Sequence, residues 1–550
     1  MSRRIFSFVG VVLFFSALTA FLTWPQAAHL RTHVPPYDDS LLSIWRISWI
    51  AHALSTPAPL VDANIFYPEL RTLAYTDAVL LQGLIAAPFI RSGASPVLVY
   101  NLLILGSIAL SGAAMCLLAQ RLTRSLAAGL VAGTIFGFVT FRFDHYMHLE
   151  LQATVFLPLA LWALDRAFES GRGRDMAAFG AFLVLQVISG IYYTVFLATA
   201  LAVAIPWRWL GLDPPQRTRF VKQLAVTAAL SGAVAAPYLA IYMQNRSSVG
   251  ERADSEVRLY SATPLNYLAS DPGSVVHGWW GEQLGRSERR LFPGVLAIGL
   301  AVYGWRGRSH RKTMVIIVGL VGFVISLGLH TPVYGLLREL VFTYRGLRSP
   351  ARAAALVFLA IAVLAGYGWQ AVLARRPQWR RVGTALLVGL LSLEYITFAP
   401  LWLVLPRTPP ATARWLAQQP RSVVVEFPLP KAHELHTIHD GMYMYASIFH
   451  WQPLLNGYSG FYPNSYMELI ELMKRFPSDD TIAYLRQREV DLIVLHGTYM
   501  KPDELGKWAT ILSARNDVRV EAEFQEQGGP DIVFRLLPPT PASPAPPPPQ

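Results

Sequence analysis

Charged residues are scarce in this chain: Asp, Glu, Lys and Arg make up 15% of its 550 residues, whereas 53% are hydrophobic. A soluble domain usually carries about a quarter charged residues. The few charges are clustered, so that stretches such as 11–23, 126–140 and 353–369 contain none. A helix needs roughly 20 mostly apolar residues to cross a bilayer core, and lipid offers no partners to exposed backbone groups. The pattern therefore predicts a helical membrane protein.

Cysteine is almost absent as well. The single cysteine, Cys116, lies in an apolar run, so an internal disulfide is excluded and the residue is expected to be a small core residue. Acidic residues are fewer than basic ones, which gives a net charge of +12. Most of the basic residues lie in short loops between apolar segments, and no nucleic-acid-binding motif is present. We therefore expect no nucleic-acid partner.

The apolar segments predict about eleven membrane-spanning helices. The first follows Arg3 and Arg4 and is longer than the core of a signal peptide, so it is expected to remain uncleaved with its basic end in the cytoplasm. The predicted spans are 5–23, 97–119, 125–141, 152–167, 176–190, 192–208, 223–243, 291–305, 313–329, 351–373 and 383–402.

One further apolar segment, 78–92, is short and contains Gln82, Gly83 and Pro88. Whether it crosses determines the side of every later loop. If it is interfacial or re-entrant, five basic loops around residues 121–124, 166–174, 208–222, 306–312 and 375–381 all lie in the cytoplasm. The Lys and Arg content of short loops sets orientation, so we predict that 78–92 does not cross. The same reasoning requires two spans to meet near Gly190 rather than one long helix.

This topology predicts outward loops at 24–77, 142–151, near 190, at 244–290 and at 330–350, followed by an outward C-terminal region. There, β-like runs at 422–427, 492–496 and 532–536 alternate with helical patterns at 466–475 and 480–488, which is typical of a small α/β domain. The predicted domains are a transmembrane domain at 1–402, a soluble extracytoplasmic α/β domain at 403–537, and a disordered Pro-rich tail at 538–550.

Acidic residues and histidines gather in the outward loops. The first loop contains Asp38 and Asp39, then an amphipathic stretch at 41–54 whose tryptophans suit a membrane interface, then Glu69. The second loop holds two acids and two histidines within ten residues, namely Asp144, His145, His148 and Glu150. A carboxylate at a membrane edge can accept a proton from an attacking hydroxyl or bind a divalent metal beside histidine. Each residue can also be an ordinary loop residue.

An acidic pair in the first outward loop, about ten further spans and an outward soluble domain together resemble the GT-C superfamily. These are polytopic glycosyltransferases that use sugars carried on polyprenyl phosphates, such as protein mannosyltransferases and aminoarabinose transferases. The resemblance implies that Asp38 or Asp39 is a catalytic base or metal ligand, and that Asp144, or Glu150 in its place, forms a second acidic site. Between the paired acids we expect Asp39 to matter more, because the amphipathic stretch begins just after it and adjacent residues of an extended loop point to opposite sides.

Three arginines at an outward edge break the trend of basic residues on the inner side: Arg345, Arg348 and Arg352. Arginine binds phosphate bidentately, so these residues are candidates for binding a lipid phosphate; anchoring to lipid headgroups is the alternative. His145, His148 and Glu69 complete the predicted substrate-binding set. A divalent metal is compatible with these side chains, but the sequence assigns no cofactor.

These observations predict an enzyme of the cytoplasmic (inner) membrane. It would transfer a sugar from a polyprenyl-phosphate donor to a glycan, lipid or protein acceptor on the outer side. The alternatives are a ligase or polymerase of lipid-linked glycans, a transporter, and a non-catalytic scaffold. Transporters favour charged or broken helices at mid-membrane, whereas the polar residues here gather at one face, which disfavours transport.

Overall fold

The computed structural model describes residues 2–307, 309–397, 402–432, 434, 435 and 437–538, except for the side chains of 2–7 and 282. The predicted tail at 538–550 thus lies almost wholly outside the described residues. The chain forms two compact units. Unit 1 contains the residues up to Pro36 together with 77–246 and 250–405, and unit 2 contains 37–76, 247–249 and the residues from Pro406 onward.

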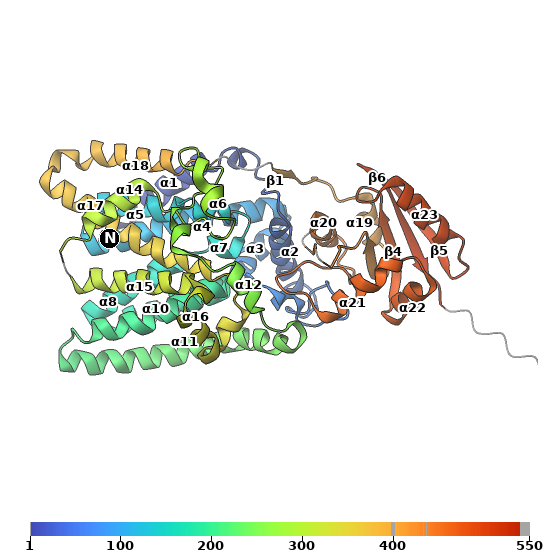
Figure 1. Cartoon of the computed structure of the whole chain (residues 1–550), viewed down its shortest axis with the longest axis horizontal. Helices are drawn as coiled ribbons and strands as arrows, with labels where there is room; N and C mark the ends of the chain where they lie inside the picture. The colour runs from blue at the N-terminus through green and yellow to red at the C-terminus, as the bar shows by residue number, and fades with distance from the viewer. Residues whose placement is uncertain (1, 308, 398–401, 433, 436, 539–550) are drawn as a thin grey trace, which may run out of the picture. The chain divides into compact units, whose positions relative to one another are not determined.

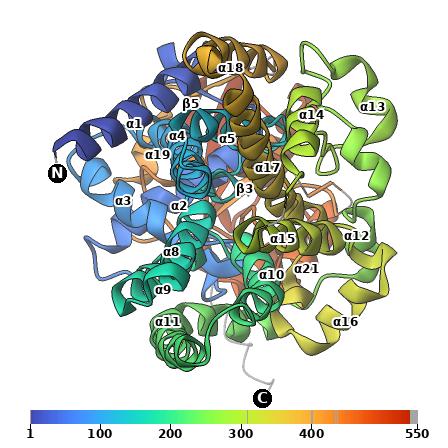
Figure 2. The ribbon, with the colours of Figure 1, turned by 90° about the vertical axis from the view of Figure 1, so that its left-hand side faces the viewer.

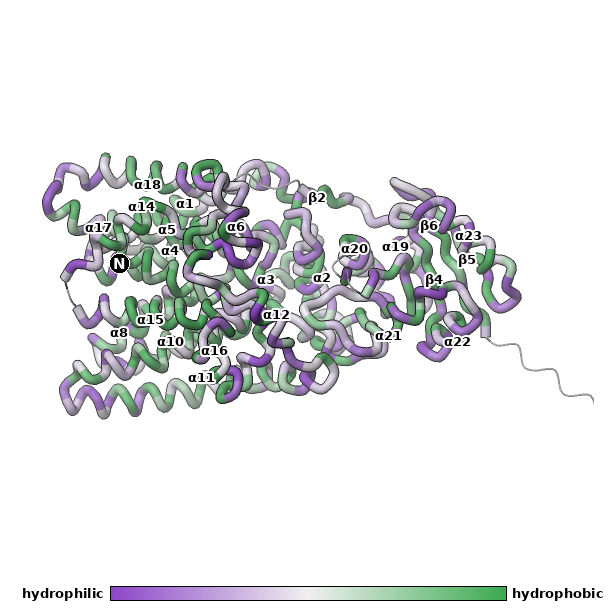
Figure 3. The backbone as a smooth tube through the Cα atoms, viewed as in Figure 1, coloured by the Kyte–Doolittle hydropathy of each residue, from purple (hydrophilic) through white to green (hydrophobic). Residues whose placement is uncertain are grey.

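Unit 1 is a bundle of helices, and each of the eleven predicted spans overlaps one of them (Figure 1). Among the described residues, five helices are long and apolar enough to cross a membrane, and several shorter apolar helices accompany them. Figure 3 shows hydrophobic residues along these helices and hydrophilic residues near their ends. The chain is therefore a helical membrane protein. The helices are α1 (Ser2–Leu22), α4 (Pro96–Thr123), α5 (Leu126–Phe138), α8 (Phe156–Ser170), α9 (Gly173–Ser189), α10 (Ile191–Trp209), α11 (Pro214–Val249), α14 (Val295–Gly304), α15 (His310–Ser326), α17 (Ala354–Arg375) and α18 (Val382–Glu394).

The two segments on which the predicted topology depended have clear conformations. The helix α3 (Leu80–Arg91) has 12 residues, or about 18 Å at 1.5 Å per residue, a length similar to those of the apolar helices α14 and α18, so that its not crossing the membrane stays a prediction from the basic loops. The chain breaks at Gly190, whose extended backbone separates α9 from α10. Two helices therefore meet there, as the distribution of basic loops requires.

The loops predicted to face the cytoplasm come together at one end of unit 1. There the carboxylate of Asp165 on α8 pairs with Arg121 at 2.5 Å, with Arg208 at 2.8 Å and with Arg311 at 3.4 Å. Glu169, one turn later on α8, also pairs with Arg121 and Arg311. These contacts join the ends of α4, α8, α10 and α15.

The loops predicted to face outward meet at the other end. The side chain of Asn101, near the start of α4, donates to the backbone oxygens of Leu30 and His33. Gln82 of α3 donates to the oxygen of Ser189 at the turn between α9 and α10. Short helices also belong to unit 1: α6 (Phe141–Asp144), α7 (Leu149–Gln152), α12 (Asp254–Leu259), α13 (Gly281–Leu284) and α16 (Pro332–Leu340).

The bundle is closely packed around α4, α5 and α17, while α11 lies at its edge (Figure 2). In the most apolar part of each, 83% of the residues are buried in Leu126–Asp144, which comprises α5 and α6, but only 11% in α11. Close approach of α14 and α17 depends on glycine. A Cβ on Gly304 would lie 1.9 Å from the backbone oxygen of Leu364, and one on Gly368 would lie 2.1 Å from that of Leu300. Small residues let membrane helices approach in this way.

Unit 2 contains a four-stranded sheet in the order β3-β4-β6-β5, in which β3 and β4 are parallel and the other neighbours antiparallel. Its strands β3 (Val423–Phe427), β4 (Val490–His496) and β6 (Gly529–Leu536) occupy the three predicted runs, and β5 (Val518–Glu526) is an additional strand. One face of the sheet buries an apolar cluster that includes Val424, Leu492, Val494 and Val533. Helices α19 (Ala411–Leu416), α20 (Ile438–Ser447), α21 (Asn464–Leu472), α22 (Asp479–Gln487) and α23 (Pro502–Ser513) complete the C-terminal part.

Residues 37–76 of the first outward loop group with unit 2, although the predicted domain boundary at 402 places the whole loop with the membrane helices. Its helix α2 (Asp38–Ala53) packs against α20, and the backbone N–H of Phe66 donates to the oxygen of Asn456. The prediction of an interfacial stretch at 41–54 was wrong. Trp45 and Trp49 are buried in protein, and their indole N–H groups donate to Asn64 and to the oxygen of Leu60. An apolar helix face fits lipid and protein equally well, so sequence alone does not separate the two.

Candidate functional site

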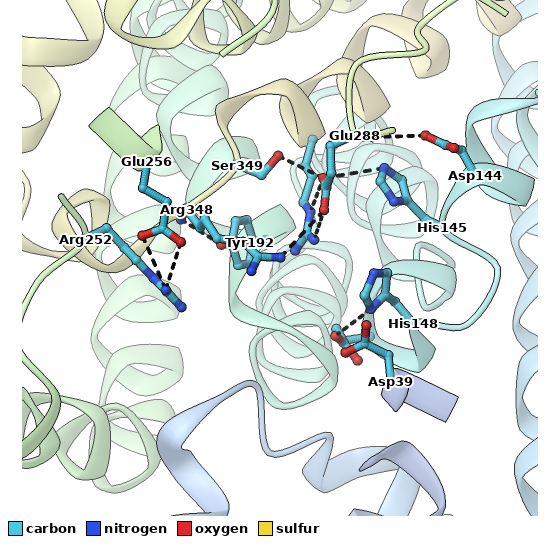
Figure 4. A network of polar contacts seen from close by, with 12 residues as sticks. Asp39, Asp144, His145, His148, Tyr192, Arg252, Glu256, Glu288, Arg348 and Ser349 are labelled. Atoms are coloured by element: carbon cyan, nitrogen blue, oxygen red, sulfur yellow. Dashed lines mark hydrogen bonds and ion pairs between the residues drawn. The ribbon is translucent and has the colours of Figure 1, made fainter. Parts of the chain in front are cut away.

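A buried carboxylate, Glu288, organises a charged cluster in the loops of unit 1 (Figure 4). Its Oε2 atom accepts hydrogen bonds from Nε of Arg352 and from Oγ of Ser349, both at 2.9 Å. Arg352 also donates to Oε1, so the pair is bidentate. Burial raises the pKa of Glu288, but Arg352 and the other nearby cationic groups outweigh it and hold the pKa well below its usual range. Glu288 is therefore ionised.

Asp144, at the end of α6, holds the loop that carries Glu288. Its Oδ2 atom accepts the backbone N–H of Glu288 at 3.0 Å, and its Oδ1 atom pairs with Arg290 at 2.8 Å. Glu288 has a φ of 71°, a backbone conformation uncommon for a residue other than glycine. Because both oxygens of Asp144 are engaged, its geometry favours positioning of Glu288 over the catalytic role expected from the sequence.

The three outward arginines do not form one group. Arg352 is buried against Glu288, with its guanidinium 4.9 Å from the ring centre of Tyr192. Arg348 lies 3.9 Å from Glu288, is stacked 5.0 Å from the ring centre of Tyr260, and retains 21% exposure of its side chain. The backbone N–H of Arg348 donates to the hydroxyl of Tyr192 at 2.8 Å. Arg348 therefore has a fixed backbone and a partly accessible guanidinium.

Arg345 is bound elsewhere. Its Nε donates to the backbone oxygen of Arg338 at 2.9 Å, and its Nη1 lies 3.6 Å from Glu251. Arg252 pairs with Glu256 at 3.1 Å, and its backbone N–H donates to the oxygen of Arg345. These contacts join the fourth and fifth outward loops, and they account for the position of Arg345 without a ligand.

The histidines of the second outward loop lie beside this cluster. Nε2 of His145 is 3.7 Å from Glu288, and the rings of His145 and His148 are 5.9 Å apart. Nδ1 of His148 lies 3.8 Å from Glu150. Burial lowers the pKa of His145 to about 3, more than Glu288 raises it, and Arg352 lowers it further. His145 is therefore neutral at physiological pH and available as a ligand.

His145, His148 and Glu288 offer three atoms that all lie within 4.8 Å of one another. Two imidazoles and a carboxylate are a suitable donor set for a divalent transition metal. Nε2 of His145 is buried without a hydrogen-bond partner in the described part of the chain, which also fits a ligand. A metal ion here would share the carboxylate of Glu288 with Arg352. The positive charge of that guanidinium would repel the ion and weaken its binding.

A second set of buried polar contacts fixes the backbone of this loop. Arg142 donates to the backbone oxygens of Phe136 at 2.9 Å and Gln152 at 3.2 Å. The side chain of Gln152 in turn donates to the oxygens of Arg142 and His145. The guanidinium of Arg142 is thus engaged in hydrogen bonds to the backbone. These bonds stabilise the turn at 141–152 that carries the two histidines.

The acidic pair belongs to unit 2, where it forms the first turn of α2 rather than an extended loop. The prediction that Asp38 and Asp39 point to opposite sides was therefore wrong, because successive side chains on a helix are about 100° apart. Oδ1 of Asp39 accepts the hydroxyl of Tyr458 at 3.1 Å. Burial and the neighbouring charge of Asp39 raise the pKa of Asp38 to about 6.

Glu69, also in unit 2, accepts hydrogen bonds from Ser465 at 2.6 Å and from Tyr75 at 3.5 Å. The contact with Ser465 connects the segment around Glu69 to α21, and the predicted role of Glu69 in substrate binding stays a prediction. The structure thus brings together Asp144, His145, His148, Glu150, Arg348 and Arg352 in unit 1, whereas Asp38, Asp39 and Glu69 lie in unit 2.

Sequence reasoning missed Glu288. It lies in the run Arg286-Ser287-Glu288-Arg289-Arg290, within a long outward loop without periodicity. A single acid among three arginines was its only signal in the sequence, and that signal equally fits a solvated surface loop.

Comparisons with known proteins agree with this architecture. A family model described as a domain of unknown function (DUF6311) matches residues 45–347. No curated protein matches the sequence. The crystal structure of the Archaeoglobus fulgidus oligosaccharyltransferase in its apo form is similar to this chain with a TM-score of 0.52 at 10% identity, covering 91% of this chain and 71% of the other.

Two crystal structures of ArnT from Cupriavidus metallidurans are more distant. The form bound to undecaprenyl phosphate has a TM-score of 0.45 at 13% identity, and the apo form has 0.40 at 12%; each covers 97% of this chain and 98% of the other. At such identities a structural likeness concerns the fold alone. The chain has a GT-C-like fold, as expected from the sequence.

Proposed function

This chain belongs to the DUF6311 family, and we propose that it is a membrane glycosyltransferase. It would take a sugar from a polyprenyl-phosphate donor and pass it to a glycan, lipid or protein acceptor on the outer side of the cytoplasmic membrane. The similarity to an oligosaccharyltransferase concerns fold, so the proposal depends on the site. The observation that carries it is the Arg348–Arg352 pair held around Glu288.

The two arginines have different tasks. Arg352 is fixed by its bidentate pair with Glu288 and supplies a buried positive charge. Arg348 is partly accessible and not tightly paired, so its planar guanidinium is free to bind phosphate oxygens bidentately. As the bond between the anomeric carbon and the phosphate oxygen breaks, the bonding electrons remain on the phosphate. A preorganised guanidinium stabilises that developing charge.

The acceptor hydroxyl would attack the anomeric carbon from the opposite side, which inverts the anomeric centre. Its proton would pass to a carboxylate, and the resemblance of the acidic pair to that of GT-C glycosyltransferases makes Asp39 the candidate, with Asp38 as the neighbouring acid. A new bond between the acceptor oxygen and the anomeric carbon replaces the one to phosphate, so no other co-reactant is required. A divalent metal held by His145, His148 and Glu288 would add positive charge near the donor. Proton transfer and stabilisation of the leaving phosphate are performed by the side chains of the protein.

The test is donor binding by the purified full chain in lipid nanodiscs, with undecaprenyl phosphate as the probe. We expect Arg348→Lys to weaken binding about tenfold and Arg348→Ala to weaken it further, since lysine keeps the charge but loses the planar fork. Arg345→Ala is the matched control, because that arginine is paired with Glu251 and the backbone of α16. Parental binding by both Arg348 variants would assign these arginines to headgroup anchoring and overturn the proposal.

A further inference from the structure

The helix α16, in the fifth outward loop of unit 1, turns its apolar face away from the protein. Val333, Leu336 and Leu340 are exposed, the last of them to 72%, and their spacing places them along one face of the helix. On the opposite face Tyr334 is fully buried, and the guanidinium of Arg338 donates to a backbone oxygen of the fourth outward loop at 2.7 Å. A surface helix of a soluble protein has the reverse arrangement, because its apolar face packs on the core.

The fourth outward loop shows the same reversal. In the 3-10 helix η3 (Pro264–Leu268), Leu265 and Leu268 are exposed, whereas Asn266 between them is buried. The side chain of Asn266 accepts the backbone N–H of Thr263 at 2.7 Å and donates to a backbone oxygen of α13 at 2.8 Å. The polar side chain therefore holds the loop together from within, and the two leucines face the surroundings.

A third segment, later in the same loop, follows this pattern. Val275, Val276 and Trp279 are exposed, and Trp279 reaches 77%. His277 lies between them but is buried, and its Nε2 is 2.9 Å from Oε1 of Glu394. Three separate segments thus direct large apolar side chains outward and polar side chains inward. In contact with water such a surface is unfavourable, and large apolar patches on soluble proteins mark sites of interaction.

These segments are attached where helices of the membrane bundle end. The hydroxyl of Tyr267, in η3, lies 2.8 Å from Oγ of Ser326, the last residue of α15. The helix α16 follows α15 after the short 3-10 helix η5 (Gly328–His330). The backbone N–H of Val275 donates to the oxygen of Ile396, just after the end of α18. In Figure 2, α12, α13 and α16 lie at one side of the bundle, outside α14 and α15.

We propose that these segments form an interface with lipid, immersed in the membrane leaflet at this end of the bundle. The apolar loop surface is defined by Leu265, Leu268, Val276, Trp279, Leu336 and Leu340. The proposal concerns how unit 1 contacts the bilayer, and it does not depend on the proposed transferase function.

Lipid is the occupant that the surroundings favour. Leu320 on α15 and Leu393 on α18 are exposed on the helices themselves, so the apolar loop surface continues a lipid-facing side of the bundle. Amphipathic segments at a membrane surface immerse their apolar face by about 5–10 Å, and tryptophan is enriched at that depth. The reversed polarity has the same cause: polar groups facing lipid would lose their hydrogen bonds to water, so they need partners inside the protein.

The experiment measures immersion of the purified full chain in nanodiscs of phosphatidylethanolamine and phosphatidylglycerol. A nitroxide is attached to single cysteines introduced by Leu268→Cys, Val276→Cys and Leu340→Cys, in a chain that carries Cys116→Ala. Collisions with oxygen, which concentrates in hydrocarbon, are compared with collisions with a polar nickel chelate, which stays in water. Val520→Cys is the matched control, because Val520 of β5 is 46% exposed and Val276 44%. We expect the oxygen-to-nickel ratio to be at least about tenfold higher at the three loop positions, since moving a polar complex out of water is costly.

The two collision rates separate lipid from the other occupants. Val234→Cys on α11, a predicted span, gives the ratio of a lipid-facing position. Loop ratios equal to that of Val520→Cys would show that the surface faces water and would overturn the proposal. Low collision rates with both reagents would show that a protein, either a partner or a second copy of this chain, covers the surface, and this result would overturn it as well.

Trp279 provides a second measurement that needs no label. Brominated lipids quench the fluorescence of a tryptophan that contacts their acyl chains. The emission lost on Trp279→Phe should be at least about twofold weaker in brominated nanodiscs than in ordinary ones, as for an interfacial indole. Trp508→Phe is the control in unit 2, and the emission lost in that variant should be the same in both lipids. Equal emission from Trp279 in the two lipids would contradict immersion of this surface.

Discussion

Each end of unit 1 holds a buried carboxylate surrounded by arginines, and the two clusters differ in how completely they are paired. Asp165 contacts Arg121, Arg208 and Arg311, and Glu169 shares two of those cations. Glu288 binds Arg352 and Ser349 closely but lies 3.9 Å from Arg348 and 3.7 Å from His145. In the first cluster the carboxylates are closely paired with arginines. In the second cluster the guanidinium of Arg348 and the imidazole of His145 are not closely paired with Glu288.

The difference in pairing indicates a difference in role. The Asp165 cluster joins helix ends from α4, α8, α10 and α15, so its charges stabilise the bundle. The Glu288 cluster is built from loops and from the start of a helix, and loops carried by a rigid scaffold commonly bear binding and catalytic residues. A buried ion pair alone is weak evidence for stability, so the comparison requires experiments that perturb each cluster separately.

The largest effect is expected for the acidic pair of the first outward loop. If the chemistry belongs to the outward loops, Asp39→Asn removes the base while preserving the shape of the side chain. Loss of a general base typically lowers the rate by about 10²–10⁴. Sugar transfer by the purified variant in lipid measures this loss, with Asp38→Asn as the comparison, for which we expect a smaller decrease. Parental rates in both variants would contradict a catalytic role for this loop.

The next largest effect concerns stability at the opposite end. Asp165→Asn leaves Arg208 without its carboxylate partner, and the side chain of Arg208 is only 8% exposed. Breaking a buried pair costs about 3–5 kcal/mol. Reversible unfolding in mixed micelles should show a loss of this size, while donor binding by the folded fraction stays unchanged. A decrease in donor affinity without loss of stability would reverse the roles assigned to the two clusters.

The pH dependence of transfer sharpens the assignment of the acids. The pKa of Asp38 is raised to about 6 by burial and by the charge of Asp39, and adjacent acids titrate as a coupled pair. Below pH 6 the pair gains a proton, so the rate should fall as pH decreases and level off above that value. Asp38→Asn removes the group that titrates near pH 6, so the acidic limb of its rate profile should move to lower pH. A limb that stays near pH 6 in this variant would exclude Asp38 as its origin.

Much of the helical architecture could be predicted from the sequence, because a bilayer imposes length and composition on any helix that crosses it. The short α3 and the break at Gly190 followed from the distribution of basic loops. The second outward loop was also recognised, since two acids and two histidines in ten residues are unusual.

Other features depend on contacts distant in sequence and could not be predicted. The amphipathic pattern of α2 is compatible with lipid, and only its packing against α20 shows that protein covers it. Glu394 is a charged residue within the last predicted span, and the sequence around it indicates no partner. It accepts the backbone N–H of Val295 at 2.5 Å and lies 2.9 Å from Nε2 of His277, so it stabilises the start of α14. Its partners are about 100 or more residues away in the chain.

The smallest effect is expected for Glu169→Gln. This variant tests whether burial or charge pairing alone determines how much a carboxylate of the Asp165 cluster contributes to stability. Glu169 contacts two of the arginines that Asp165 contacts, but its side chain is 45% exposed. Water already solvates such a carboxylate, so an exposed pair contributes only about 0–1 kcal/mol. Under the same unfolding conditions, Glu169→Gln should therefore change stability by less than about 1 kcal/mol, several times less than Asp165→Asn. Salt should reduce even this small difference, since exposed pairs are screened. Equal losses in the two variants would mean that the whole arginine cluster, and not the buried Asp165 carboxylate, determines the stability of this end of the bundle.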